Sequence, residues 1–151
     1  MKKIILFSVI FIILLSGCGK KPLMDELAKD GNYHYQNKDL GFSLVLPPEF
    51  IYYQTQRKNT DDFTDIEIFV PTNDTSYPQE VPSYAKPIAI RIFSNDYWNN
   101  SNEEERGLYQ KVGAKGNFVY TIRFWDYPPT DWTDKWSEEM KNKIAENFEN
   151  L

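Results

Sequence analysis

The strongest constraint on this chain is an apolar segment at its N-terminus that differs from everything after it. Lys2 and Lys3 precede Ile4–Leu15, which is apolar except for Ser8. As an α-helix, these twelve residues would rise about 18 Å. A bilayer core is about 30 Å thick and needs about 20 residues. The segment therefore fits the apolar region of an export signal better than a membrane-spanning helix.

The residues that follow resemble the lipobox of bacterial lipoproteins. Leu15-Ser16-Gly17-Cys18 places a branched aliphatic residue and two small residues before a cysteine. The resemblance implies that residues 1–17 are a signal peptide and that Cys18 carries a diacylglyceryl thioether, often with a further acyl chain such as palmitate. An ordinary secretory signal and an uncleaved anchor are the alternatives. Cys18 is the only cysteine of the chain, and a free thiol would be unusual in an exported protein, which favours lipidation.

Lipidation at Cys18 would determine where the protein is located. One acyl chain holds a protein only marginally, whereas two or three make attachment effectively permanent. The expected location is the cell membrane or the outer membrane, with the domain on the extracytoplasmic side. Residues 18–31 would then be the lipidated cysteine and a polar tether.

The composition of the remaining chain indicates one acidic globular domain. Residues 18–151 hold 15 of the 17 basic residues and all 22 acidic residues, a formal net charge of −7. The length suits a single domain, predicted over residues 32–151, that must fold without a disulfide. The acidic balance argues against nucleic acid as a partner and against a polybasic surface for anionic lipid.

Alternating apolar residues predict a set of short strands. The predicted strands are Tyr33–Tyr35, Gly41–Leu46, Phe50–Gln54, Asp65–Val70 and Pro87–Phe93, followed by a hairpin of Leu108–Val112 and Gly116–Tyr127 that turns through residues 113–116. Polar turn-forming residues predict loops over Thr55–Thr64 and Thr72–Lys86. Ser94 is placed to cap a short helix.

A helix is predicted at the C-terminus. Apolar residues recur every fourth position on an otherwise charged segment, which predicts one apolar face; they are Trp132, Trp136, Met140, Ile144 and Phe148. Thr130 or Thr133 could cap this helix. Because the hairpin arm Gly116–Tyr127 is semi-apolar on its second face, helices are expected to cover the antiparallel sheet. The predicted class is α+β, with the C-terminal amphipathic helix packed on the sheet.

Two segments resemble PsbP-like domains. One is a tyrosine-containing strand and turn followed by Gly41-Phe42-Ser43-Leu44-Val45-Leu46-Pro47-Pro48, with Phe50 at a bulky position. The other is Lys143-Ile144-Ala145-Glu146-Asn147-Phe148, where Asn147 replaces the usual serine. The resemblance implies an α/β/α sandwich and a binding or assembly role in the cell envelope rather than catalysis. It carries no functional residue onto this chain.

The chain offers little catalytic chemistry. His34 is the only histidine, and neither a Gly-x-Ser-x-Gly motif nor a phosphate-binding glycine loop is present. Asp61, Asp62 and Asp65 could supply oxygen ligands for calcium, but loop carboxylates are usually solvated and the EF-hand spacing is absent. We therefore predict no catalytic residue, no metal site and no cofactor.

Aromatic residues near predicted loops and strand ends are the better candidates for a functional surface, because exposed rings can stack on sugars or anchor a protein partner. They are Tyr52, Tyr53, Tyr77, Tyr84, Tyr97, Trp98, Trp125 and Tyr127. Tyr77, Tyr84, Tyr97 and Trp98 are the predicted binding residues. The leading hypothesis is a non-catalytic module that binds an envelope protein, with the predicted loop Thr72–Lys86 and the nearby aromatic residues as its contact surface. A glycan-binding lipoprotein and, last, a carboxylate-based envelope hydrolase are the alternatives.

Overall fold

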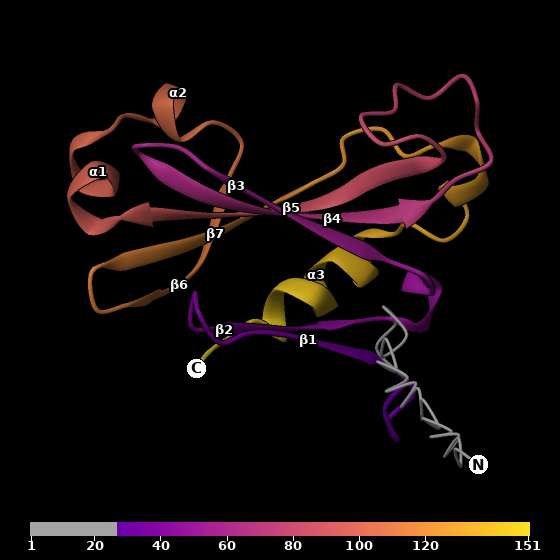
Figure 1. The fold of residues 1–151 in the computed structure, drawn as a ribbon, viewed down its shortest axis with the longest axis horizontal. Helices are drawn as coiled ribbons and strands as arrows, with labels where there is room; N and C mark the ends of the chain where they lie inside the picture. The colour runs from indigo at the N-terminus through magenta and orange to yellow at the C-terminus, as the bar shows by residue number, and fades with distance from the viewer. Residues whose placement is uncertain (1–26) are drawn as a thin grey trace, which may run out of the picture.

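A computed structural model describes residues 27–151, so Cys18, the lipobox and residues 1–17 lie outside the described part. Within that part, no helix combines the length and the apolar character needed to cross a bilayer. The described chain forms two antiparallel sheets with a few short helices, an α+β arrangement in which β structure dominates (Figure 1).

The larger sheet has five strands in the order β3-β4-β5-β7-β6. They are β3 (Gln54–Asn59), β4 (Phe63–Pro71), β5 (Tyr84–Ser94), β7 (Phe118–Phe124) and β6 (Gln110–Lys115). The smaller sheet has the order β1-β2-β8, with β1 (Tyr33–Asn37), β2 (Phe42–Leu46) and β8 (Glu149–Asn150). The helices are α1 (Asn95–Asn100), α2 (Glu103–Arg106) and α3 (Glu138–Glu146), and the 3-10 turns are η1 (Pro48–Phe50) and η2 (Thr130–Trp132).

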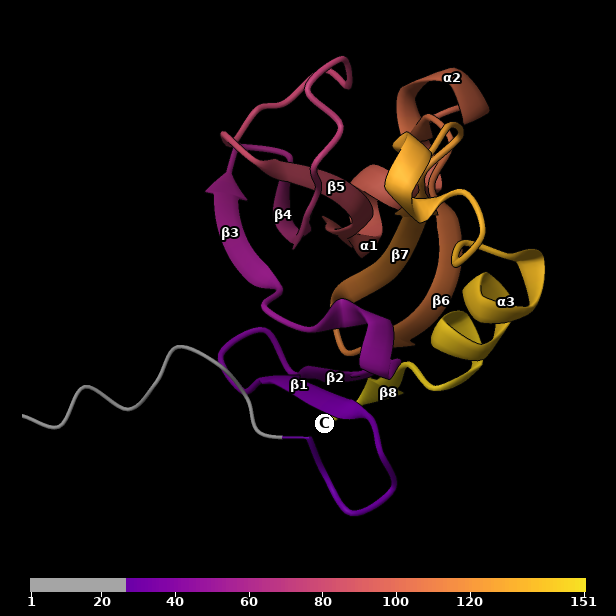
Figure 2. The same cartoon turned by 90° about the vertical axis from the view of Figure 1, so that its right-hand side faces the viewer.

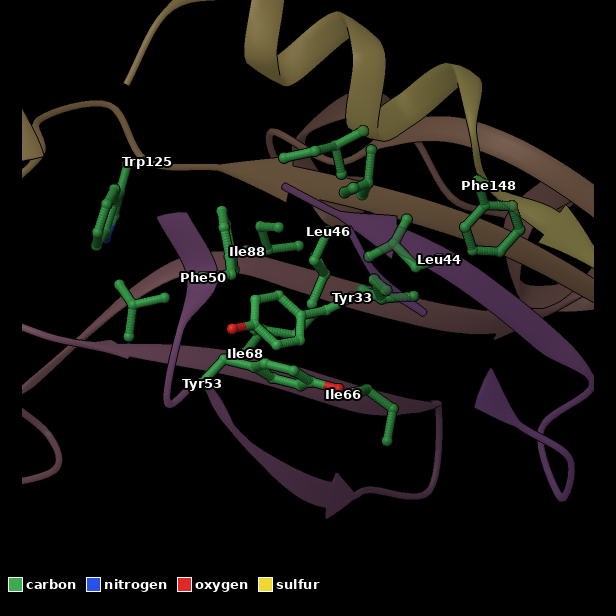
Figure 3. Packing of buried hydrophobic residues seen from close by; sticks show 14 of the residues in the cluster. Tyr33, Leu44, Leu46, Phe50, Tyr53, Ile66, Ile68, Ile88, Trp125 and Phe148 are labelled. Carbon is green, nitrogen blue, oxygen red and sulfur yellow. The ribbon is translucent and has the colours of Figure 1, made fainter. Parts of the chain in front are cut away.

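The core lies between the two sheets. Ile66, Ile90 and Ile122 form one row across β4, β5 and β7, and each is at most 2% exposed. The alternating side chains of β2 face this row from the smaller sheet, and α3 contributes Ile144 to the same cluster (Figures 2 and 3). The cluster thus joins residues that are far apart in the chain.

Several predicted elements are confirmed. Gly41–Leu46 forms β2 with its three alternate apolar residues fully buried, Asp65–Val70 lies within β4, and Pro87–Phe93 lies within the central β5. Ser94 caps α1 by accepting a hydrogen bond from Tyr97 N at 3.1 Å. The predicted hairpin forms, but it turns at Gly116 and Asn117 rather than through residues 113–116.

Two local predictions are wrong. Phe50–Gln54 is not a strand, because Pro48–Phe50 forms a 3-10 turn and Tyr52 takes a left-handed φ of 62°. Thr55–Thr64 is not a loop, because its first half belongs to β3. β3 is an edge strand with both faces largely exposed, so it shows no apolar alternation even though it pairs with β4 over six residues.

The expected single sheet with helices on both faces is also corrected. One face of the five-stranded sheet packs on the smaller sheet and α3, and the C-terminal helix covers only Glu138–Glu146 instead of starting at Thr130 or Thr133. Trp132 and Trp136 still enter the core, at 3% and 8% exposure. They do so from η2 and the turn after it, because side-chain spacing every fourth residue does not require a continuous helix.

Candidate functional site

The outer face of the five-stranded sheet, turned away from the core, carries a pocket of about 490 Å³. Phe69, Ala89 and Arg123 reach its floor from β4, β5 and β7. Ala89 pairs with Glu67 on one side and Arg123 on the other, and its short side chain leaves space between these longer ones. We call this hollow the aromatic pocket; its other lining residues are Tyr77, Pro78, Glu80, Tyr84, Ala85, Lys86, Tyr109, Phe124, Trp125, Asp126 and Tyr127.

Tyrosines form much of the wall. Tyr127 stands at the rim with 85% of its surface exposed, whereas Tyr77 packs edge-on against Trp125 with ring centroids 6.1 Å apart. The Tyr84 hydroxyl accepts a hydrogen bond from Gln54 Nε2 at 2.8 Å. Burial raises the pKa of the Tyr77 and Tyr109 hydroxyls. A tyrosine hydroxyl is protonated at neutral pH in any case, so both can donate to an oxygen of a ligand.

One wall belongs to residues 72–83, which we call the pocket loop; it lies over the same end of the sheet as η2 (Figures 1 and 2). Two aspartates, one in the pocket loop and one in η2, each accept hydrogen bonds from the other segment. Asp74 Oδ2 accepts from Thr130 N at 2.9 Å and from Thr130 Oγ1 at 3.0 Å. Asp131 accepts from Thr72 Oγ1 at 2.7 Å and from Asn73 N at 2.9 Å. Hydrogen bonds from Ser76 Oγ, and then from Thr130, hold the pKa of Asp74 well below its usual range.

Ion pairs fasten the far part of the same loop. Lys86 Nζ lies 2.8 Å from Glu67 and 2.5 Å from Glu80, and Lys58 Nζ lies 2.6 Å and 3.1 Å from the same two carboxylates. Ion pairing with Lys86, and then with Lys58, lowers the pKa of Glu80. Burial acts to lower the pKa of Lys86, but its two carboxylate partners outweigh this effect and raise it. The four charges join the loop to β3, β4 and β5, so the wall is preorganised.

The other polar candidates have structural partners. Asp65 Oδ1 and Oδ2 each lie 2.7 Å from the Arg91 guanidinium, which is placed 3.5 Å from the Phe63 ring centroid. Asp65 therefore does not join Asp61 and Asp62 in a cation site. His34 Nε2 lies 2.9 Å from Asp30 Oδ2 at an exposed position. Among residues 27–151, no group of three or more His, Cys, Asp or Glu is placed to hold a metal ion.

The four predicted binding residues fall into two separate groups. Tyr77 and Tyr84 both line the aromatic pocket. Tyr97 and Trp98 belong to α1, at the opposite end of the sheet (Figure 1). There Tyr97 stacks on buried Phe93 with centroids 5.4 Å apart, and the Arg106 guanidinium lies 4.5 Å from the Trp98 ring centroid. These contacts give Trp98 a packing role, whereas Tyr97 also lines a second hollow, of about 370 Å³, together with Asp61 and Asp62.

Several lining residues were not predicted as site residues. Phe69 and Arg123 come from strands, where a sequence offers no sign that one position faces a pocket and another a neighbouring side chain. Lys86 falls at the end of the predicted loop Thr72–Lys86, which is wrong over its last three residues because β5 begins at Tyr84. Tyr127 lies three residues after the end of β7; its place near a strand end put it among the candidate aromatic residues, but not among the four predicted binding residues. Comparisons of the chain with protein-family models, curated proteins and solved structures gave no match.

Proposed function

We propose that this protein is a bacterial lipoprotein, held by lipid on Cys18 in the cell membrane or the outer membrane, and that residues 32–151 form a binding module on the extracytoplasmic side. The lipobox-like Leu15–Cys18 and the preceding apolar segment support the anchor. The likeness to PsbP-like domains belongs to the same proposal. It is supported by a first hairpin whose second strand ends at Leu46, before Pro47-Pro48, and by a final short helix before Phe148.

The aromatic pocket is the proposed binding site, and its preorganised wall is the observation that carries the proposal. Ligand sites usually have volumes of about 300–1,000 Å³ and combine aromatic walls with a few polar groups. A wall that is already ordered reduces the entropy lost on binding. The Asp74 and Asp131 hydrogen bonds and the Glu80 ion pairs provide that order.

A glycan fits the chemistry of this pocket best. The apolar face of a sugar ring can stack on Tyr127 or Tyr84, because aromatic rings offer flat apolar area together with a polar edge. Sugar hydroxyls both donate and accept hydrogen bonds. The rim offers carboxylates that accept hydrogen bonds and cationic groups that donate them. Glu80, Asp126, Lys86 and Arg123 supply two charges of each sign, so the rim favours a neutral polar ligand over a strongly charged one.

An envelope protein is the second candidate, and the exposure of Tyr127 favours it. A tyrosine that is 85% exposed beside a pocket is the type of residue that anchors protein interfaces. A partner would place a side chain in the pocket and cover Tyr127. Catalysis is not proposed, because the lining carboxylates Glu80 and Asp126 both face cations, at 2.5 Å and 3.2 Å.

Replacing Tyr127 tests the proposal. The full-length lipidated protein in detergent would be screened against an array of cell-envelope glycans, and hits would be measured by calorimetric titration. We expect Tyr127→Ala to weaken binding about tenfold or more, which corresponds to roughly 1.4 kcal/mol for a lost stacking ring. Tyr127 is too exposed for its loss to disturb the fold.

Phe118→Ala is the matched control, because Phe118 is 51% exposed and begins β7 at the end opposite the pocket. It should leave binding unchanged. Capture of one envelope protein that is lost with Tyr127→Ala, together with an empty glycan array, would favour the second candidate. Equal behaviour of the two variants toward every ligand would refute the pocket as the binding site, and glycan cleavage during incubation would refute the non-catalytic assignment.

A further inference from the structure

Ile51 and Tyr52 form an exposed apolar tip between two buried aromatic residues. Phe50 is fully buried and Tyr53 is 9% exposed, whereas Ile51 and Tyr52 are 44% and 52% exposed. Tyr53 N donates to Phe50 O at 3.0 Å and closes the turn. Phe50 also packs edge-on against Trp132, with centroids 5.7 Å apart. The buried residues on either side therefore fix the position of the two exposed residues, which we call the apolar tip.

The backbone at Tyr52 is strained. Its φ of 62° lies in the left-handed region, where a bulky side chain costs free energy that glycine or asparagine would avoid. Strain of this kind persists at positions where the side chain or the backbone shape has a use. With 52% of its surface exposed, the Tyr52 side chain gains only partial burial to offset this strain, which points to a use of its exposed part outside the fold.

The apolar tip lies where the chain comes from its N-terminal segment. The Tyr33 and Tyr53 rings pack edge-on with centroids 5.9 Å apart, and Tyr33 pairs with Leu46 at the end of β2. Ala28 N donates to Asn32 O at 2.8 Å, so exposed Leu27 enters beside the same end of β1. Both views place η1 next to this start of β1 (Figures 1 and 2).

Few residues separate this end of the domain from the proposed lipid. Eight residues lie between Cys18 and Leu27, and fully extended they span at most about 30 Å. A lipidated Cys18 would therefore keep Leu27 within that distance of the bilayer surface, and with it the end of the domain that carries Ile51 and Tyr52. Tethering raises the effective concentration of a weak second contact.

We propose that the apolar tip, with Leu27 beside it, rests in the interfacial layer of the bilayer that holds the lipid anchor, and so orients the domain. Tyrosine is enriched at this depth because its ring is apolar and its hydroxyl is polar, and Ile51 supplies apolar area. The neighbouring charge is the acidic Glu49, which cannot attract anionic lipid, so the contact is apolar and salt should not weaken it. The inference rests on the proposed anchor at Cys18. With the tip in the interface, the aromatic pocket, on the far side of the five-stranded sheet from β1 and β2, remains open to solvent.

A single dye can test this contact in the full-length protein. Once Cys18 is acylated, Glu49→Cys provides the one free thiol of the chain. The labelled protein would be placed on phosphatidylethanolamine–phosphatidylglycerol vesicles that contain spin-labelled lipid quencher. We expect the dye at position 49 to be quenched at least about twofold more than a dye at Asn99→Cys on α1, with no loss of quenching on adding salt.

Variants at the tip complete the test. Ile51→Ser with Tyr52→Ser should reduce quenching at position 49 to the level at position 99, while cosedimentation with vesicles and glycan binding are unchanged. Tyr52→Trp should retain quenching, because tryptophan shares the interfacial preference. Equal quenching at positions 49 and 99 on vesicle-bound wild-type protein would overturn the contact and leave the anchor intact. Cys18→Ala is the control that should not cosediment with vesicles. If the wild-type protein also failed to cosediment, both the lipid anchor and the membrane contact of the tip would be overturned.

Discussion

At the scale of single residues, two residues other than glycine adopt the left-handed backbone conformation within the described part of the chain. Tyr52 and Ser83 both have positive φ values, 62° and 64°. Ser83 precedes Tyr84 at the end of the pocket loop, and its N–H donates to Gln79 Oε1 at 2.7 Å. A side-chain hydrogen bond thus supports one strained residue, whereas exposed Tyr52 has only the closed turn of its own backbone.

Two substitutions measure the strain at Tyr52. Tyr52→Gly should be more stable than Tyr52→Ala by about 1 kcal/mol, because glycine adopts the left-handed conformation without the clash that a Cβ introduces, although it loses more entropy on folding. The measurement is the free energy of unfolding in urea. Alanine and glycine variants of equal stability would show that the left-handed backbone carries no net cost here.

Glu80 makes the pocket loop sensitive to acid. Its pKa is lowered by Lys86 and Lys58, so the folded protein binds this proton less readily than the unfolded chain does. The stabilisation is complete above the unfolded pKa, near 4.5, and disappears as the pH falls through the lower folded pKa. Because the Glu80 side chain is 52% exposed, we expect less than about 1 kcal/mol.

The measurement is the free energy of unfolding between about pH 6 and pH 3 for wild type and Glu80→Gln. The difference between them should shrink as the pH falls, and salt should reduce it at neutral pH. Glu103→Gln, on exposed α2, is the control and should follow wild type. A difference that grows on acidification would contradict the assigned ion pairs.

At the scale of elements, β3 and α3 show how context decides a boundary. The polar run Gln54–Asn59 becomes a strand because β4 supplies hydrogen-bond partners along its length. Its exposed position at the edge needs no apolar residue, and Arg57 and Lys58 discourage pairing with another chain. α3 begins only at Glu138, where Ser137 Oγ accepts from Met140 N at 3.1 Å.

The cap at Ser137 predicts a measurable loss. Ser137→Ala removes the acceptor for one N–H of the first turn and should lower the free energy of unfolding by about 1 kcal/mol. Ser137→Asp keeps an acceptor and adds a charge favourable to the helix N-terminus, so it should be close to wild type in chemical denaturation. An alanine variant as stable as the aspartate variant would place the start of the helix elsewhere.

At the scale of the whole molecule, Phe42 joins the two sheets. It is fully buried, stacks on Phe148 with centroids 5.4 Å apart and contacts the Tyr120 ring at 6.1 Å. The three rings come from β2, from the chain after α3 and from β7. The contact between the sheets is therefore aromatic and closely packed.

Truncation of Phe42 should be among the most damaging single changes. Phe42→Ala removes a ring and leaves a cavity, and we expect a loss of about 3–5 kcal/mol in the free energy of unfolding. Phe118→Ala, on an exposed ring, should change it by less than about 1 kcal/mol. The free energy of unfolding of both variants would be measured in guanidinium. If Phe42→Ala lost no more than Phe118→Ala, the smaller sheet would not pack on the larger one as described.

Local properties of the chain follow from the amino-acid sequence alone. Apolar alternation locates β2, β4 and β5, proline residues end strands at Leu46 and Pro71, and a serine caps α1. The lipobox-like Leu15–Cys18 and the acidic balance are also properties of neighbouring residues or of composition. These signals are available because a strand or cap depends mainly on side chains within a few positions of one another.

The division into two sheets, the edge strand β3 and the aromatic pocket required the tertiary structure. Alternation marks a strand with one buried face but not the sheet that buries it, so β2 could not be separated from the larger sheet. The pocket joins Phe69, Tyr77, Lys86, Tyr109 and Tyr127 from different segments. Residues far apart in sequence become neighbours only through strand order and register, and these are set by burial of the shared core, not by any local pattern.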